Sequence, residues 1–461
     1  MHSSQIGAGI QIPPNSSRIL KRWNLLAKCQ AVSIQPTEFI LRSYRSGHIL
    51  SRADQSLYTT EEYGAPYLHI HRADYHRILV EEAERLGVTI LLNSAATGID
   101  FETPAVHLKH RPDFPADLIL GADGLKSVCR EALLGRPDPP HLTGDLAYRL
   151  LIKASDMEKE PALRELASGS AINIWVGPDA HVVGYFLQEG GLYNMVLSCR
   201  DNLPELVNSA KADLTEMREA FRGWDPKLGM LLGLVRESTK WRLLNSWEME
   251  RWSHPGGKFA LLGDACHATL PYLYVASSFP PSFSQSYRIV SAPARAFICR
   301  PINPLSKPRL RFSPTHRAQG AALALEDGAL LGHLFSRPLS PTATATATAT
   351  PSLLTLYETL RKPRATRIVQ LSTAIGAMLH LRDGPAQQER DRRFRLEEQS
   401  GEKRGSENVW ADDGYVEWVF GYDVLGLGDG EGVGKGDGKG VGKGEGVGEG
   451  EGEVVTGGIP T

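Results

Sequence analysis

The stretch Phe259-Ala-Leu-Leu-Gly-Asp-Ala-Cys-His-Ala-Thr-Leu-Pro271 decides the fold class of this chain. Its short apolar run, bounded by glycine, is typical of a buried strand. The step Gly263-Asp264 then places a carboxylate just beyond the strand, at the edge where open α/β sheets bind ligands. Such a carboxylate suits the hydroxyl groups of a ribose or ribityl chain. The alternative is a simple turn in which Asp264 caps a helix.

A second stretch, Asp117-Leu-Ile-Leu-Gly-Ala-Asp-Gly-Leu-Lys-Ser-Val-Cys-Arg130, has the same character. An apolar run ends in a turn at Asp123 and Gly124, and Ser127 and Arg130 follow on a predicted helix. The backbone N–H groups at such a helix start favour an anionic group. Arg130 alone would equally suit the protein surface.

Together with His69-Ile-His-Arg-Ala-Asp74, these stretches resemble the group A flavoprotein monooxygenases in order and separation. These are the FAD-dependent aromatic hydroxylases of the salicylate and para-hydroxybenzoate hydroxylase type. The resemblance covers about residues 7–273 and 318–380, with a weaker similarity near 410–423. It implies an α/β fold with a Rossmann-like, three-layer FAD-binding domain, which lacks its first βαβ unit here, and an inserted antiparallel-sheet substrate domain.

The resemblance also implies which residues contact the cofactor. In that family the Gly-Asp motif, here Gly263 and Asp264, binds the ribityl region of FAD. The Asp-Gly motif, here Asp123 and Gly124, contacts both FAD and the nicotinamide coenzyme. The other expected FAD contacts are Gly9, Gln11, Arg72, Pro271, Gly320 and Ala321. From the residues alone, Arg72 would equally suit a solvated position in the first turn of a helix.

In the resembled family NADH or NADPH reduces FAD, O2 adds to give a C4a-hydroperoxide, and the distal oxygen passes to an electron-rich ring. The resemblance therefore implies hydroxylation of a phenolic or salicylate-like substrate. Arg149 and Tyr185 are the predicted catalytic residues, and with His181 they are polar positions on predicted strands. Each of them could face the pocket or be an ordinary sheet residue. The alternatives for function are a flavin epoxidase of the same fold and a non-enzymatic, truncated relative.

The beginning of the sequence matches the dinucleotide-binding motif GxGxxG poorly. In Gly7-Ala-Gly-Ile-Gln-Ile-Pro-Pro-Asn15 no strand precedes the glycines, and Pro13 and Pro14 would obstruct the helix that should follow. The family's GxGxxG motif belongs upstream of this segment. Either the sequence begins after that motif, or the protein lacks the site for the AMP half of FAD.

Hydrophobic periodicity, combined with what the resemblance implies, predicts the domain organisation. The predicted parts are a partial FAD-binding domain (1–141), a substrate-binding sheet domain (142–250), the rest of the FAD-binding domain (251–380, with a linker at 340–351) and a C-terminal extension (381–461) with a disordered Gly-rich tail from 426. The main predicted strands are 88–92, 146–152, 171–176, 181–187 and 193–199, and the main helices are 72–86, 206–221 and 353–379.

Residues 274–317 interrupt the family pattern. They contain no Asp or Glu, many arginines, scattered prolines and no sustained periodicity. Joining Leu273 to Ala318 restores the family's pattern, Pro-Tyr-Leu-Ala-Gln-Gly. We interpret this anomalous insertion as a retained intron, and the alternative is a basic, disordered loop.

Composition narrows the class of protein. The formal charge of −2 over 461 residues gives no reason to expect a nucleic-acid partner. The five cysteines are scattered without a CxxC pair, which fits a reducing compartment and predicts no metal site. No run of eighteen apolar residues and no signal-peptide pattern occurs. We therefore expect a cytoplasmic protein that acts on a small molecule and does not bind membranes.

Overall fold

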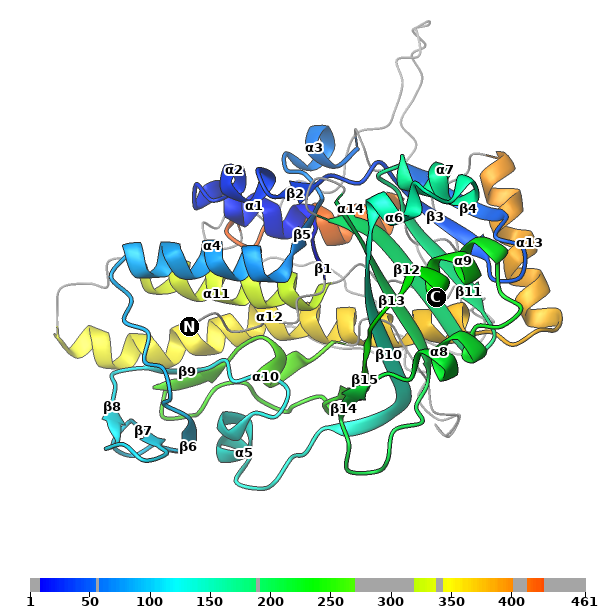
Figure 1. The fold of residues 1–461 in the computed structure, drawn as a ribbon. Coiled ribbons are helices and arrows are strands. Elements are labelled where there is room, and N and C mark those ends of the chain that lie inside the picture. Colours follow the sequence, from blue (N-terminus) through cyan, green and yellow to red (C-terminus); the bar gives the residue numbers. More distant parts are fainter. Residues whose placement is uncertain are drawn as a thin grey trace, which may run out of the picture.

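The computed structural model describes residues 9–54, 58–187, 191–269, 319–336, 343–400 and 413–426. Figure 1 shows two parts side by side, a large twisted sheet and a region where long helices lie next to short strands. Helix α12 (Ala343–Leu379) runs along both parts. Pro271, the insertion at 274–317 and the Gly-rich tail beyond Gly426 lie outside the described residues.

The large sheet contains the strands predicted for the substrate domain. Within the described residues its strand order is β14 (Ser209–Lys211), β15 (Thr239–Asn245), β10 (His141–Lys153), β13 (Leu192–Arg200), β12 (Ala180–Leu187), β11 (Ile172–Gly177), β3 (Glu38–Ser43) and β4 (Ile49–Asp54). All neighbours are antiparallel except β11 and β3. Strands β3 and β4 come from the segment assigned to the FAD-binding domain, because the pairing of distant strands leaves no mark on local periodicity.

Each face of this sheet packs against a different layer. Alternate residues of a strand point to opposite faces, so Val182 and Phe186 lie on one face and Val183 and Tyr185 on the other. The first face packs on a core that includes α8 (Leu214–Ala220) and α9 (Pro226–Leu234), with the short helices α6 (Ala154–Met157), η1 (Pro161–Leu163) and α7 (Arg164–Ala167). The second, inner face packs on the end of α12, α13 (Pro385–Ser400) and α14 (Asp413–Phe420).

The other part is built around three small sheets. These are β1 (Gly9–Ile12) with β5 (Leu68–His71) and β2 (Ser33–Ile34), β9 (Ile119–Gly121) with β16 (Phe259–Leu261), and β6 (Ala96–Asp100) with β7 (Ala105–Leu108) and β8 (Phe114–Pro115). The helices of this part are α1 (Pro14–Arg22), α2 (Leu26–Gln30), α3 (Tyr58–Tyr63), α4 (Arg72–Arg85), α5 (Val128–Leu134), α10 (Asp264–His267) and α11 (Gln319–Ser336). In Figure 1, α4, α11 and α12 lie roughly parallel to one another.

Three segments differ from the prediction. Residues 88–92 form no strand and are exposed, with Leu92 74% accessible, because no described strand pairs with them. Residues 206–221 contain β14 followed by α8, because Asp213 accepts from the N–H groups of Thr215 and Glu216 and starts the helix there. The predicted linker at 340–351 contributes the first turns of α12, in keeping with the high helix propensity of alanine.

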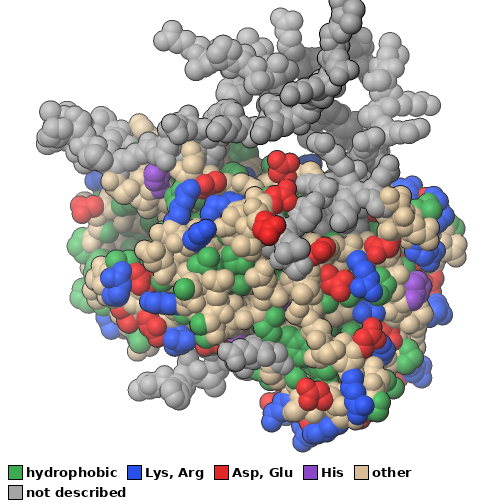
Figure 2. Space-filling model, turned by 90° about the horizontal axis from the view of Figure 1, so that it is seen from above, with side chains coloured by type: hydrophobic (Ala, Val, Ile, Leu, Met, Phe, Trp, Pro, Cys, Tyr) green, Lys and Arg blue, Asp and Glu red, His purple; other side chains and the backbone are tan. Residues whose placement is uncertain are grey.

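The face of the molecule seen in Figure 2 shows no single dominant charge. Figure 2 shows acidic and basic side chains interspersed over the face that it presents. Within the described residues, no helix combines the length and the apolar character that a membrane span requires.

Candidate functional site

The two motif strands are neighbours. β9 and β16 pair in parallel with Ile119 opposite Phe259, and the N–H of Leu262 donates to the carbonyl of Gly121 at 3.0 Å. Because parallel strands end at the same edge of a sheet, the Asp-Gly turn and the Gly-Asp turn lie beside each other. The sequence therefore placed both motifs correctly at one edge.

Arg130 ties these two turns together. Its side chain is buried, donates to the carbonyl of Ala265 at 3.2 Å and forms an ion pair with Asp138 at 2.9 Å. A surface position for Arg130 is therefore wrong. Asp123 accepts from the hydroxyl of Ser127 at 2.5 Å and from a backbone N–H at the start of α5.

Gly124 and Gly263 both have backbone conformations that favour glycine. Gly124 has φ +80°, and no atom lies within 4 Å of the position that a Cβ would occupy. Gly263 has φ +61°, and a Cβ there would lie 3.2 Å from the Cβ of Ala324 in α11. Space beside Gly124 and close helix packing at Gly263 are what a turn around a large ligand requires.

Asp264 presents an open carboxylate at this edge. Gly263 is the N-cap of α10 and Asp264 is its first residue, so the alternative that Asp264 caps the helix is wrong. The side chain is exposed, yet burial by surrounding protein raises its pKa, with His267 and Arg72 acting in the opposite direction. Arg72 is near enough to act on the charge of Asp264.

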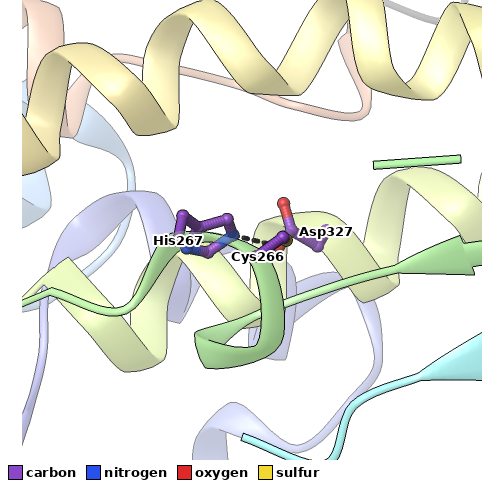
Figure 3. A group of neighbouring side chains, drawn as sticks. All are labelled: Cys266, His267 and Asp327. Atoms are coloured by element: carbon purple, nitrogen blue, oxygen red, sulfur yellow. Dashed lines mark hydrogen bonds and ion pairs between the residues drawn. The ribbon is translucent and has the colours of Figure 1, made fainter. Parts of the chain in front are cut away.

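Asp327 of α11 lies next to the Gly-Asp turn and stabilises it (Figure 3). Its carboxylate accepts from the N–H of Gly263 at 3.0 Å, from Nε2 of His267 at 2.5 Å and from Nε of Arg361 at 2.8 Å. Burial alone would raise the pKa of Asp327, but the charges of His267 and Arg361 outweigh it and lower the pKa to about 2. Asp327 is therefore a fixed anion that positions the turn.

Cys266, His267 and Asp327 lie close enough together to suggest a metal site (Figure 3). The Cys266 thiol donates to the carbonyl of Gly263 at 3.4 Å, and burial raises its pKa well above the usual value. Asp327 is already bonded to three protein donors, one of which is Nε2 of His267. We therefore assign these side chains to the support of the turn.

A buried ion network extends from Asp327. Glu326, wholly buried, forms ion pairs with Arg361 at 2.6 Å and Arg364 at 3.0 Å, and accepts from the amide of Asn15 at 2.7 Å. The guanidinium of Arg364 lies 3.7 Å from the ring centroid of Tyr422. The network joins α1, α11 and α12 beneath the turn.

The start of α11 lies against the loop after α10. A Cβ at Gly320 would be 2.6 Å from Oγ1 of Thr269. Gly320 and Ala321 are partly exposed, and their backbone N–H groups lie in the first turn of α11, beside the Gly-Asp turn. The two chain segments that flank residues 270–318 are thus adjacent in space.

Strand β1 connects this region to the large sheet. The N–H of Gly9 donates to Oδ1 of Asn194 at 3.1 Å, and a Cβ on Gly9 would lie 2.7 Å from the ring of Tyr185. Gln11 accepts from the hydroxyl of Tyr67 at 2.6 Å and is also hydrogen-bonded to Tyr185. Gly9 and Gln11 therefore position Tyr185 at the junction of the two parts.

His69 completes this junction. It lies opposite Gln11 in the β1–β5 pair, and its ring centroid is 4.3 Å from that of Tyr185. The side chain is fully buried and neither ring nitrogen has a hydrogen-bond partner among the described residues. Burial lowers the pKa of His69 to about 3, so the ring is neutral.

The middle of the inner sheet face is partly open. Arg149 of β10 is aligned with Val196, which is aligned with Val183, and these side chains are all only partly buried. The guanidinium of Arg149 lies 5.4 Å from the ring centroid of Trp241, which is also partly buried. His181 and Tyr185 flank Val183 at about 7 Å along β12 on the same face.

Electrostatic influence relates several of the predicted site residues to one another. Arg72 is close enough to influence the pKa of both Asp264 and Arg149, and Arg149 influences that of Tyr185. Sequence reasoning missed His69 and the supporting pair of Asp327 and Arg361 as site residues. The sequence Glu326-Asp327 inside an otherwise apolar helix was the available signal, because buried carboxylates need partners.

No profile of a protein family matches the chain. It is 34% identical to the FAD-dependent monooxygenase OpS4 of Beauveria bassiana, over 92% of this chain and 88% of that protein. It is 27% identical to the 3-hydroxybenzoate 6-hydroxylase of Polaromonas naphthalenivorans, over 82% and 79% of the two chains.

Solved structures show the same fold. A salicylate hydroxylase substrate complex aligns with a TM-score of 0.66 at 21% identity, over 92% of this chain and 90% of that one. CtdE in complex with FAD and a substrate aligns with a TM-score of 0.67 at 17% identity, over 93% and 89%. The predicted α/β fold with a large sheet is therefore confirmed.

Proposed function

Because the chain belongs to the FAD-dependent monooxygenases, one of which is 34% identical to it over 92% of its length, we propose that it uses NADH or NADPH and O2 to hydroxylate a phenolic carboxylate. Two relatives support this substrate class by name, a 3-hydroxybenzoate 6-hydroxylase and a 6-hydroxynicotinate 3-monooxygenase. Each name denotes an aromatic acid that already carries a hydroxyl group.

The observation that carries the proposal is Arg149 on the open part of the inner sheet face. Among the described residues Arg149 forms no ion pair with Asp or Glu, and burial lowers its pKa. A cation withdrawn from water without a counter-ion is costly, so an anionic ligand would be bound strongly there. Trp241, Val183 and Val196 beside it would contact the faces of an aromatic ring.

The residues at the strand edge fit the flavin half of FAD. Asp264 offers an exposed carboxylate for hydroxyl groups, Arg72 lies near enough to act on its charge, and space remains beside Gly124. The N–H groups of Gly320 and Ala321 at a helix start would face negative charge on a flavin ring. When bound, FAD supplies the activation of O2 with electrons from the nicotinamide coenzyme.

The protein's own groups would prepare the substrate. A phenol becomes more electron-rich when it loses its proton, and His181 or Tyr185 beside Val183 would contact its hydroxyl group. Packing of the ring on Val183 and Val196 would exclude water from the reacting carbon. Arg149 at one end of the ring would fix which carbon faces the flavin.

The test is to purify the chain, measure flavin absorbance, and follow NADH and NADPH oxidation with 3-hydroxybenzoate, with salicylate and with their methyl esters. We expect faster oxidation with the free acids, and a product that gains one labelled oxygen atom from 18O2. Arg149→Met should raise KM for the acids at least tenfold, since an ion pair lost from a buried site costs more than about 1.4 kcal/mol.

Lys153→Met is the matched control, because it removes a cation from an exposed position of the same strand. It should leave KM unchanged. Coenzyme oxidation that no aromatic acid stimulates, or product without labelled oxygen, would contradict the proposed function.

A further inference from the structure

Trp241 and Arg149 meet on the inner face of the large sheet. Trp241 of β15 is aligned with Ala147 of β10, a residue of the inner-face core, and Arg149 lies two residues further along β10. Opposite residues of antiparallel strands, and residues two apart on one strand, point to the same face. The guanidinium carbon of Arg149 lies over the indole ring, 5.4 Å from its centroid. At this distance the face of an aromatic ring attracts a cation.

The residues on either side of Trp241 leave room for this contact. Ala147 lies opposite Trp241 on one neighbouring strand, and Ser209 of β14 lies opposite it on the other. Both have small side chains, which cover little of a large indole ring placed between them. Trp241 is accordingly only partly buried, although its strand has a neighbour on each side. Its ring is therefore available to Arg149.

The guanidinium of Arg149 has few other contacts to hold it. Among the described residues Arg149 forms no ion pair with Asp or Glu, and its Nε has no hydrogen-bond partner. Burial lowers the pKa of Arg149, Tyr185 opposes this, and the like charge of Arg72 adds to it. Repulsion from Arg72 and hydration would both draw this flexible side chain away from the sheet. Trp241 counters these effects, because a ring face attracts a cation more strongly where water is partly excluded.

We propose that Trp241 is a positioning residue, which holds the guanidinium of Arg149 on the inner sheet face in the place where it binds the carboxylate of the substrate. The inference rests on the proposed function for the identity of that substrate. A guanidinium attracted to a ring keeps its planar set of N–H donors free, and these donors match the two oxygens of a carboxylate. Holding Arg149 in place beforehand reduces the conformational entropy that is lost when the acid binds.

This role separates substrate affinity from the chemical step. The contact between Trp241 and Arg149 is the same in the bound substrate and in the transition state, because the carboxylate does not react. Its loss should therefore raise KM for the acids and leave kcat largely unchanged. Methyl esters carry no negative charge for Arg149, so the wild type and the Trp241 variants should bind them equally.

The first test is NMR of the full chain with labelled arginine, recorded without substrate. The signal of the CH2 group next to Nε of Arg149 is identified by its loss in Arg149→Met. In the wild type the indole ring current should move this signal upfield, and Trp241→Leu should return it to the position of ordinary arginines. Trp247→Leu is the matched control, because it removes an exposed indole that stacks on His141 instead, and it should leave the signal in place.

The second test is the affinity for 3-hydroxybenzoate, measured by calorimetry together with KM. Trp241→Leu should weaken binding about threefold to thirtyfold, and Trp241→Phe, which keeps a ring face, should retain part of the affinity. A tetrafluorinated tryptophan at position 241 nearly keeps the size of the indole but withdraws the negative charge from its face. It should therefore weaken binding about as much as Trp241→Leu, whereas a role in packing alone would leave the wild-type affinity.

Two results would overturn the inference. One is an Arg149 signal that is the same in the wild type and in Trp241→Leu. The other is an equal affinity for 3-hydroxybenzoate in the wild type and in the fluorinated protein. Failure of the wild type to bind or hydroxylate any phenolic acid would instead count against the proposed function, since the NMR readout needs no substrate.

Discussion

Replacing Asp327 by Asn should destabilise the protein and loosen the Gly-Asp turn. The carboxylate faces three donors, the N–H of Gly263, Nε2 of His267 and Nε of Arg361. An Asn side chain has the same shape, but its amide nitrogen must point toward one of these donors. Breaking one partner of a buried ion pair costs about 3–5 kcal/mol, because the other charge stays in a dry environment.

Thermal unfolding measures this cost. With an unfolding entropy of about 2.1 cal/mol/K per residue and 461 residues, Asp327→Asn should lower Tm by about 3–5 °C. Glu219→Gln is the control, because it removes an exposed carboxylate that pairs with the exposed Arg222, and it should shift Tm by less than about 1 °C. The purified Asp327→Asn protein should also retain less FAD.

The pH dependence gives a second readout for Asp327. Its pKa is about 2, below the value of 3.8 for an unperturbed carboxyl group. Its contribution to stability is therefore complete above about pH 4 and is lost as pH falls toward 2. Asp327→Asn should have a flatter stability profile in that window. Equal Tm and equal FAD content in wild type and variant would refute the reasoning.

Three further predictions concern backbone, charge and chain length. Gly263→Ala should lower the free energy of unfolding, measured by thermal unfolding, by about 1–3 kcal/mol, because Gly263 has a positive φ. Gly229→Ala is the control: a Cβ there would meet no atom within 4 Å, so this substitution in α9 should leave the stability unchanged or raise it. Burial raises the pKa of Asp145 to about 7, so the free energy of unfolding should fall as pH rises from about 4 to 7. Asp145→Asn should remove this pH dependence when unfolding is measured across that range. Deleting 274–317 should leave FAD binding intact, because Thr269 and Gly320 on either side of this segment lie next to each other; a weaker FAD affinity of the shortened chain would contradict this.

Local patterns predicted the parts of the fold that depend on neighbouring residues. The apolar runs before Asp123 and Asp264 identified two strands that pair in parallel, and alternation identified the strands that carry Arg149 and Tyr185. In the structure His181 and Tyr185 both lie on β12, four residues apart, and therefore share a face. These features follow from strand geometry, which sequence expresses directly.

Local sequence patterns did not predict how distant segments pack against one another. The positions of β3 and β4 in the large sheet depend on pairing with β11 rather than on their own residues. The apolar run at 88–92 is exposed although it has the composition of a buried strand. The role of Asp327 depends on a partner more than thirty residues away along the chain, Arg361, so no spacing rule could identify it.

The central claim is that the edge formed by β9 and β16 holds the flavin through Asp264. The most direct test is the dissociation constant of FAD for the wild type and for Asp264→Asn, measured by quenching of flavin fluorescence. Loss of charge-assisted hydrogen bonds worth about 1.5–3 kcal/mol should weaken FAD binding about tenfold to a hundredfold. An unchanged dissociation constant in a variant with wild-type Tm would place the cofactor elsewhere and contradict the account.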